Sequence, residues 1–259
     1  MQKLPVLKIL VGAFMVPWWD KRNYIKSLAL PALLMVSVWV CWLVLDSYDL
    51  PLIGWLSAFL YLASFSIFAV TCHRLILVGD QRSIGSYLLS NQFIVVKFLL
   101  WSVAVSFLVG LIDTFIMSVV LNVSGSFMGE VVPLSDSGEA MATQNNAKFK
   151  LASYIAIIPG LYIMSRLSLV FPSIAIDEPL TMRQSWKCTK NNGFRIFLVV
   201  GFFPTVLSVF VGLFLRDEAS ILEQVAISLL VLLALAIGIF ALSLTFKELR
   251  NKCKVLTST

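Results

Sequence analysis

Charged residues are scarce in this chain. Asp, Glu, Lys and Arg make up 13% of its 259 residues, whereas 59% are hydrophobic and the mean hydropathy is +0.92. An average soluble domain has about 25% charged residues, so a water-soluble globular enzyme is excluded. Intrinsic disorder is excluded as well, because it requires low hydrophobicity and high charge. A polytopic membrane protein remains, since each spanning helix needs about 20 residues and the chain has room for about six.

Histidine and cysteine are also rare. One histidine leaves a Cys/His metal site without enough ligands, so we expect no metal and no cofactor. Cys41 and Cys72 fall in predicted spans, and Cys188 and Cys253 fall on the predicted cytoplasmic side. We therefore expect no disulfide. The sequence has no nucleotide-binding glycine loop, nucleophile elbow or zinc-protease His pair, so we predict no catalytic residues and no enzyme.

Long apolar runs predict the fold. They are too long and too uniformly apolar for the strands of a membrane barrel, so they predict an all-α, polytopic helical bundle with short loops. The six runs cover residues 29–45, 52–71, 98–120, 151–171, 194–215 and 225–246. The chain 1–259 is then one integral membrane domain, with an interfacial N-terminal segment (1–26), an outer loop (124–150) and a cytoplasmic tail (247–259).

Basic residues predict the orientation. With the N-terminus in the cytoplasm, 15 of the 20 lysines and arginines fall inside, and Lys148, Lys150 and Arg216 fall outside. This distribution follows the positive-inside rule, so we expect a multi-pass protein of the cell inner membrane with both termini cytoplasmic. The net charge of +6 then belongs to membrane ends rather than to a nucleic-acid-binding face.

Two segments combine aromatic and basic residues beside predicted spans. The first is the N-terminal segment, and the second is a short helix that begins near Pro179 and Thr181 and ends at 191–193, where a left-handed residue is needed. We expect both segments to lie among anionic lipid headgroups on the cytoplasmic side. A docking surface for a membrane-protein partner is the alternative. The candidate contacts are Trp18, Trp19, Lys21, Arg22, Arg74, Arg183, Trp186, Lys187 and Lys190.

The two predicted inner loops resemble each other. Arg74 and Arg166 each precede a leucine at the end of a span, and each loop continues with an acidic residue. A short helix with a serine before an aromatic residue follows, at Ser86-Tyr87 and at Ser185-Trp186. Such a repeat would make two parallel three-helix halves, related by an axis along the membrane normal.

Asp113 and Arg166 are the candidates for an intramembrane polar site, because charges inside a span are costly and suggest a function. Lys97 lies close enough to the inner end of its span to extend to the headgroups. Asp113 falls in the outer half of the membrane and Arg166 toward the inner face, so a direct pair is not favoured. We expect Arg166 to bond loop carbonyls or lipid phosphates. Asp113 is either a protonatable site or a carboxyl bonded to neighbouring polar groups.

The segment Arg166–Lys187 resembles a group of uncharacterised bacterial six-helix inner-membrane proteins. These proteins are similar to the membrane domain attached to some glycerophosphoryl diester phosphodiesterases. The shared pattern is an Arg-Leu near a span end, the turn at 172–177 and a Ser-Trp helix followed by Asn-Gly. The resemblance implies a fold and a bacterial inner membrane. It implies no phosphodiesterase activity, because the catalytic domain has no counterpart here.

Two functional hypotheses follow. The first is a non-enzymatic scaffold or accessory subunit that organises lipid or a membrane complex, because the sequence has two basic interfacial helices and no catalytic set. The alternative is a transporter of a small solute, an ion or a lipid, with Asp113 as its titrating residue. A membrane enzyme comes third, since a paired acid and base is missing.

Overall fold

A computed structural model of the chain describes residues 3–19, 21–46, 51–79, 84–127, 157–212 and 221–257. Throughout these ranges the regular structure is helical, which confirms the all-α helical bundle. Six helices in the described ranges are long and apolar enough to cross a membrane. Their apolar segments are Tyr24–Cys41, Leu56–Leu77, Gln92–Val119, Ile157–Ala175, Gly193–Val211 and Glu223–Asn251.

Most of these spans belong to single long helices, but the fourth and fifth are interrupted. Residues 157–167 are helical and lead through a turn into α6, and the fifth span contains a π-helix, η1. The labelled elements are α1 (Val6–Trp19), α2 (Lys21–Asp46), α3 (Pro51–Leu77), α4 (Ile84–Phe127), α6 (Val170–Ala175), α7 (Met182–Cys188), α8 (Gly193–Ile196), η1 (Phe197–Phe202), α9 (Phe203–Gly212) and α10 (Ile221–Thr257).

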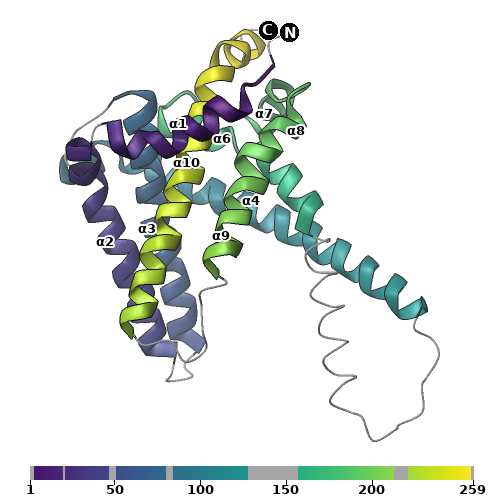
Figure 1. Cartoon of the computed structure of the whole chain (residues 1–259), viewed down its shortest axis with the longest axis horizontal. Helices are drawn as coiled ribbons and strands as arrows, with labels where there is room; N and C mark the ends of the chain where they lie inside the picture. Colours follow the sequence, from purple (N-terminus) through teal and green to yellow (C-terminus); the bar gives the residue numbers. More distant parts are fainter. Residues whose placement is uncertain are drawn as a thin grey trace, which may run out of the picture.

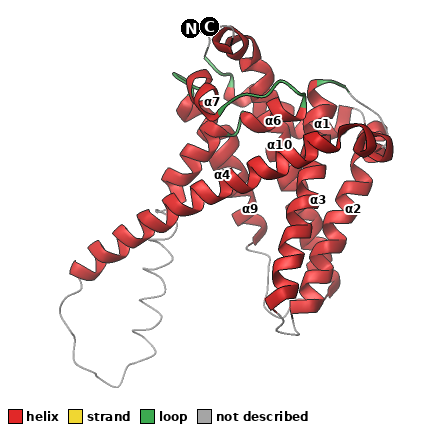
Figure 2. Ribbon diagram, turned by 180° about the vertical axis from the view of Figure 1, so that it is seen from behind, coloured by secondary structure: helices red, strands yellow, loops and turns green. Residues whose placement is uncertain are grey.

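Both chain termini lie at the same end of the bundle (Figure 1). Helices α2 and α10 both pack against α3, and α9 packs against α10. The short helices α1, α6, α7 and α8 gather toward the end that carries the termini (Figures 1 and 2), and we call them the end layer. Helix α4 contacts α3 and α6 but extends obliquely away from the other spans (Figures 1 and 2).

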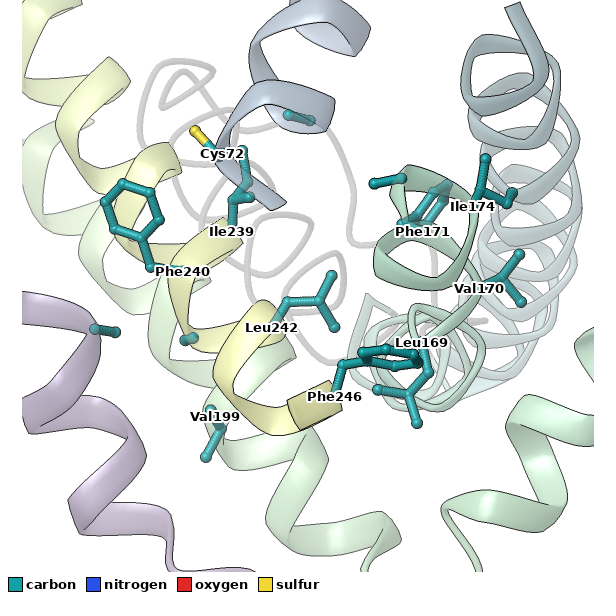
Figure 3. Packing of buried hydrophobic residues seen from close by; sticks show 14 of the residues in the cluster. Cys72, Leu169, Val170, Phe171, Ile174, Val199, Ile239, Phe240, Leu242 and Phe246 are labelled. Carbon is teal, nitrogen blue, oxygen red and sulfur yellow. The ribbon is translucent and has the colours of Figure 1, made fainter. Parts of the chain in front are cut away.

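The best-packed part of the core lies next to the end layer. Cys72 of α3, Leu169 and Ile174 around α6, and Phe246 of α10 are buried there (Figure 3). Phe68 of α3 belongs to the same buried cluster. A side chain in a lipid-immersed helix is apolar whether it faces lipid or protein, so tight packing rather than water exclusion holds such helices together. This contact between three elements keeps the end layer in a fixed position on the bundle.

Helix α1 lies across α10 rather than beside the other spans. A Cβ at Gly12 would lie 3.1 Å from the Leu244 Cδ1 atom, so the glycine allows close approach to α10. The rings of Phe14 and Phe203 meet edge to face, with their centroids 5.7 Å apart. The Lys8 Nζ atom lies 3.9 Å from Glu248 Oε1.

One sequence expectation differs from the structure at the level of the elements. The short helix expected around Ser86-Tyr87 is instead the first part of α4, which continues without interruption to Phe127. No glycine or proline stands between Ser86 and Phe98, so nothing there ends the helix. Helix α10 continues to Thr257, so the segment expected as a tail is mostly helical. The expected outer loop falls in residues 124–150, and its part after Phe127 lies outside the described residues.

Candidate functional site

Arg166 fastens α7 onto the helix that precedes α6. Its Nε atom donates to Thr189 Oγ1 at 3.0 Å, and its Nη2 atom donates to the Trp186 carbonyl oxygen at 2.7 Å. The guanidinium carbon lies 3.7 Å from the centroid of the Trp186 ring, a cation–π contact. In the opposite direction, the Ser185 hydroxyl donates to the Arg166 carbonyl oxygen at 2.6 Å. The arginine is buried, and it donates to one backbone carbonyl and one threonine hydroxyl of the protein.

Helix α7 begins as its sequence predicts. Thr181 is the N-cap, and its Oγ1 atom accepts from the Gln184 backbone N–H at 3.2 Å. The Gln184 Oε1 atom accepts from the Thr181 backbone N–H at 2.8 Å, which completes a capping box. After α7, Asn191 adopts φ 73°, the left-handed residue expected at this position.

Arg74 makes a similar connection at the end of α3. Its Nη1 atom donates to the Ala175 carbonyl oxygen at the end of α6, at 3.0 Å. Gly79, with φ 71°, donates its N–H to the Arg74 carbonyl oxygen at 3.1 Å and so ends the helix. Arg74 and Arg166 are therefore alike in donating to backbone carbonyls. They differ in that Arg74 joins α3 to an element of the other predicted half.

The segment before α1 is held by the loop after α7 and by α8. The Leu4 N–H donates to Asn192 Oδ1 at 3.1 Å, and Arg195 Nη1 donates to the Leu4 carbonyl oxygen at 3.0 Å. Leu4 itself is buried. Sequence analysis missed these contacts, because nothing in the sequence relates residues that stand 188 and 191 positions apart.

Arg250 connects α10 to the segment before α7. Its Nη2 and Nε atoms reach Glu178 Oε1 at 2.6 Å and Oε2 at 3.0 Å, a bidentate pair. The two side chains are about one-third exposed, at 34% and 36%. The pair joins the C-terminal part of α10 to the segment between α6 and α7.

Cys188 and Cys253 are joined in the structure, with their Cα atoms 5.3 Å apart. The expectation that no cysteines pair is therefore wrong for these two residues. That expectation considered only the side of the membrane on which each cysteine lies. It could not include the packing of the C-terminal part of α10 against α7, which brings Cys253 to Cys188. Cys41 is exposed and Cys72 is buried, and both are free.

The remaining candidate contacts lie on the outside of the end layer and beside it. Trp18 and Trp19 end α1 with exposed rings, and the Lys21 Nζ atom lies 4.7 Å from the Trp18 ring centroid. Trp186 is 39% exposed, although Arg166 lies over its ring. The exposed basic candidates are Lys21, Arg22, Arg183, Lys187 and Lys190. Arg74 differs from these exposed residues in donating to a backbone carbonyl of α6.

Asp113 and Arg166 do not form a pair. The Asp113 carboxyl lies against Gly160, where an added Cβ would approach its Cγ atom to 2.9 Å. Its Oδ1 atom is buried and has no hydrogen-bond partner within the described part of the chain. Lys97 of the same helix is exposed. Asp113 of α4 thus contacts helix 157–167 at Gly160, away from Arg166.

The single histidine is part of the core. His73 is 1% exposed, and its Nδ1 atom lies 2.7 Å from Ser243 Oγ. The Ser243 hydroxyl donates to the Ile239 carbonyl oxygen at 2.9 Å, so its oxygen accepts from His73 Nδ1–H. No group of three or more His, Cys, Asp or Glu side chains suited to a metal ion occurs among the described residues.

Comparison with known proteins leaves the family open. No family model matches the chain, and neither a curated protein nor a solved structure matches it. The resemblance of Arg166–Lys187 to a phosphodiesterase-associated membrane domain therefore rests on those residues alone. By its own structure the chain is a helical, multi-pass membrane protein whose arginines tie a layer of short helices to one end of the bundle.

Proposed function

We propose that this protein is a non-enzymatic scaffold or accessory subunit of a bacterial inner membrane, and that its end layer binds anionic lipid and a protein partner. One observation carries the proposal. Four arginines donate hydrogen bonds within and beside the end layer, to Ala175, Trp186, Leu4 and Glu178, while tryptophans and lysines are exposed on it and beside it. A surface held this firmly, without a catalytic group on it, is suited to presenting contacts to something else.

The chemistry of the exposed groups favours a membrane surface. Trp side chains are enriched at headgroup level, where an apolar ring with one polar N–H fits. Each lysine or arginine near an anionic bilayer surface contributes on the order of 1 kcal/mol. The positive-inside distribution predicts that this end of the bundle lies on the cytoplasmic side, next to the leaflet that carries anionic lipids. The exposed basic side chains are therefore the ones for headgroups, whereas Arg74, Arg166, Arg195 and Arg250 donate to groups of the protein.

Purification from native membranes in mild detergent, followed by mass spectrometry of co-eluting proteins and lipids, tests the proposal. A stoichiometric partner or a selective enrichment of anionic lipid is the expected result. The double variant Lys187→Gln, Lys190→Gln should reduce that enrichment. The matched control, Lys148→Gln with Lys150→Gln, removes the same charge from the predicted outer side and should leave the enrichment unchanged. The proposal is contradicted if the protein purifies without a partner and with the lipid composition of the bulk membrane, in the wild type as in both variants.

Asp113 supports a second candidate, transport of a proton or a small solute. An ionisable residue within a span is expensive and is by default a functional candidate, and the Oδ1 atom of Asp113 has no hydrogen-bond partner in the described ranges. Reconstituted vesicles under a pH gradient test this candidate. Flux above that of empty vesicles, lost in Asp113→Asn, supports transport. Flux equal to that of empty vesicles over a panel of solutes and lipids opposes it.

A further inference from the structure

A cavity of about 210 Å³ lies among α2, α3 and α10. It exists because α2 and α10 both pack along α3 but contact each other little. Met35 and Trp39 contribute from α2, Tyr61 from α3, and Ser228, Leu232 and Leu235 from α10. The cavity is thus built from three separate spans, and none of its walls belongs to the end layer.

The cavity lies in the half of the bundle that is away from the chain termini. Tyr61 lies ten residues from the start of α3 at Pro51, and Ser228 lies seven residues from the start of α10 at Ile221. Both residues therefore lie in the first half of their helices. The medium beside the cavity at this depth is the hydrocarbon part of the bilayer.

The lining of the cavity determines what can enter it. None of the lining residues is charged, so an ion or a charged headgroup would lose its solvation without compensation. The polar atoms are the Tyr61 hydroxyl, the Trp39 indole N–H and the Ser228 hydroxyl, and the last donates to the Gln224 carbonyl oxygen at 2.6 Å. An apolar cavity of about 150 Å³ is sufficient for a benzene ring. A volume of 210 Å³ therefore suits a segment of hydrocarbon chain and not a whole lipid.

We propose that this cavity binds one hydrocarbon chain of a membrane lipid, from the leaflet opposite the chain termini. The chain enters between α2 and α10 and covers Leu232 and Leu235. Its ester region lies near Tyr61 and Trp39, which carry the hydrogen-bond donors. This site differs from the headgroup contacts of the end layer in leaflet and in chemistry, so either one can be present without the other.

Photo-crosslinking with a phosphatidylethanolamine that carries a diazirine on one acyl chain tests the proposal. The full-length protein is reconstituted with increasing amounts of the probe, and labelled peptides are identified by mass spectrometry. The expected result is saturable labelling of 227–235 and 35–39, displaced by excess unlabelled lipid. Labelling that rises linearly and spreads over every exposed span surface would mean only general lipid contact, and that outcome overturns the proposal.

Two variants on α10 sharpen the test. Leu232→Trp places a large ring in the cavity and should weaken labelling about tenfold, which corresponds to about 1.4 kcal/mol of binding. Leu233→Trp is the matched control, because Leu233 is the neighbouring residue, is 50% exposed and does not line the cavity. Equal labelling of the two variants overturns the proposal.

Ser228→Leu provides an independent variant if Leu232→Trp does not fold. It fills the cavity with a side chain that a membrane helix tolerates well. Loss of labelling in Ser228→Leu supports the chain-binding site, and unchanged labelling overturns it. The lysine variants of the end layer should label like the wild type, so failure of the headgroup proposal is distinguishable from failure of this one.

Discussion

At the scale of single residues, the main result is the hydrogen-bond partner of each arginine. Arg74, Arg166, Arg195 and Arg250 all look from the sequence like basic residues at membrane ends. In the structure each donates to a carbonyl or a carboxylate of the protein. The sequence could not separate them from lipid-facing arginines, because three of the four acceptors are backbone carbonyls, which every residue has.

Arg166→Lys tests the planar guanidinium directly. A lysine has one charged nitrogen and cannot both reach Thr189 and the Trp186 carbonyl and stack on the ring. Losing a hydrogen bond from a charged group costs about 1.5–3 kcal/mol, so the thermal midpoint in detergent should fall. The control is Arg183→Lys, at an exposed position on α7, which should change little. Equal midpoints for the two variants would show that the contacts of Arg166 do not contribute to stability.

Gly201→Ala tests close packing between two interrupted spans. A Cβ at Gly201 would overlap the Ser165 hydroxyl and lie 3.2 Å from the Leu161 carbonyl oxygen. Overpacking of this kind costs about 1–3 kcal/mol. Gly110→Ala is the control, because its added Cβ would meet nothing within 4 Å. Thermal unfolding of both variants, together with the double variant Ser165→Ala, Gly201→Ala, should show a loss in the first, none in the control and partial recovery in the double.

At the scale of elements, the sequence was most informative where the signals are local. The start of α7 at Thr181 and the left-handed Asn191 that follows α7 were predicted from side chains within a few residues. Long apolar runs likewise predicted a helical bundle, and six long apolar helices of the described residues overlap those runs. The continuous α4 and the helical segment up to Thr257 were missed, because a polar stretch without glycine or proline is compatible with both a loop and a helix.

Thr181→Ala should loosen α7 in particular. It removes the oxygen that accepts the Gln184 N–H, at a cost of about 1 kcal/mol. Hydrogen exchange of the amides in 182–186 should become faster, while amides of α10 keep their rates. Thr181→Ser retains the oxygen and should behave like the wild type. Faster exchange throughout the bundle would mean instead that the cap supports the whole fold.

At the scale of the whole molecule, six spans and two termini at one end agree with each other (Figure 1). An even number of crossings returns the chain to the side on which it began. The contacts between distant segments at this end could not be predicted, because tertiary hydrogen bonds such as those of Leu4 with Asn192 and Arg195 leave no pattern in a single sequence.

Reporter fusions test the orientation of the molecule. A fluorescent protein fused after Thr259 or inserted after Gly79 should be bright, because both sites are predicted to be cytoplasmic. Alkaline phosphatase inserted after Asp136 should be active, because that position is predicted to be outside. Phosphatase activity at the C-terminus would reverse the orientation, and with it the leaflet assigned to each lipid contact.

The position of α1 across α10 has a consequence for synthesis. Helix α1 is synthesised well before its main packing partner, α10, which begins at Ile221. At about 10 residues per second, α1 waits on the order of 20 seconds before that helix emerges. During this interval the Trp18–Trp19 pair can hold α1 at the bilayer surface. A nascent chain stopped before residue 221 therefore lacks the main packing partner of α1, and its α1 should be cut by protease faster than α1 of the full chain.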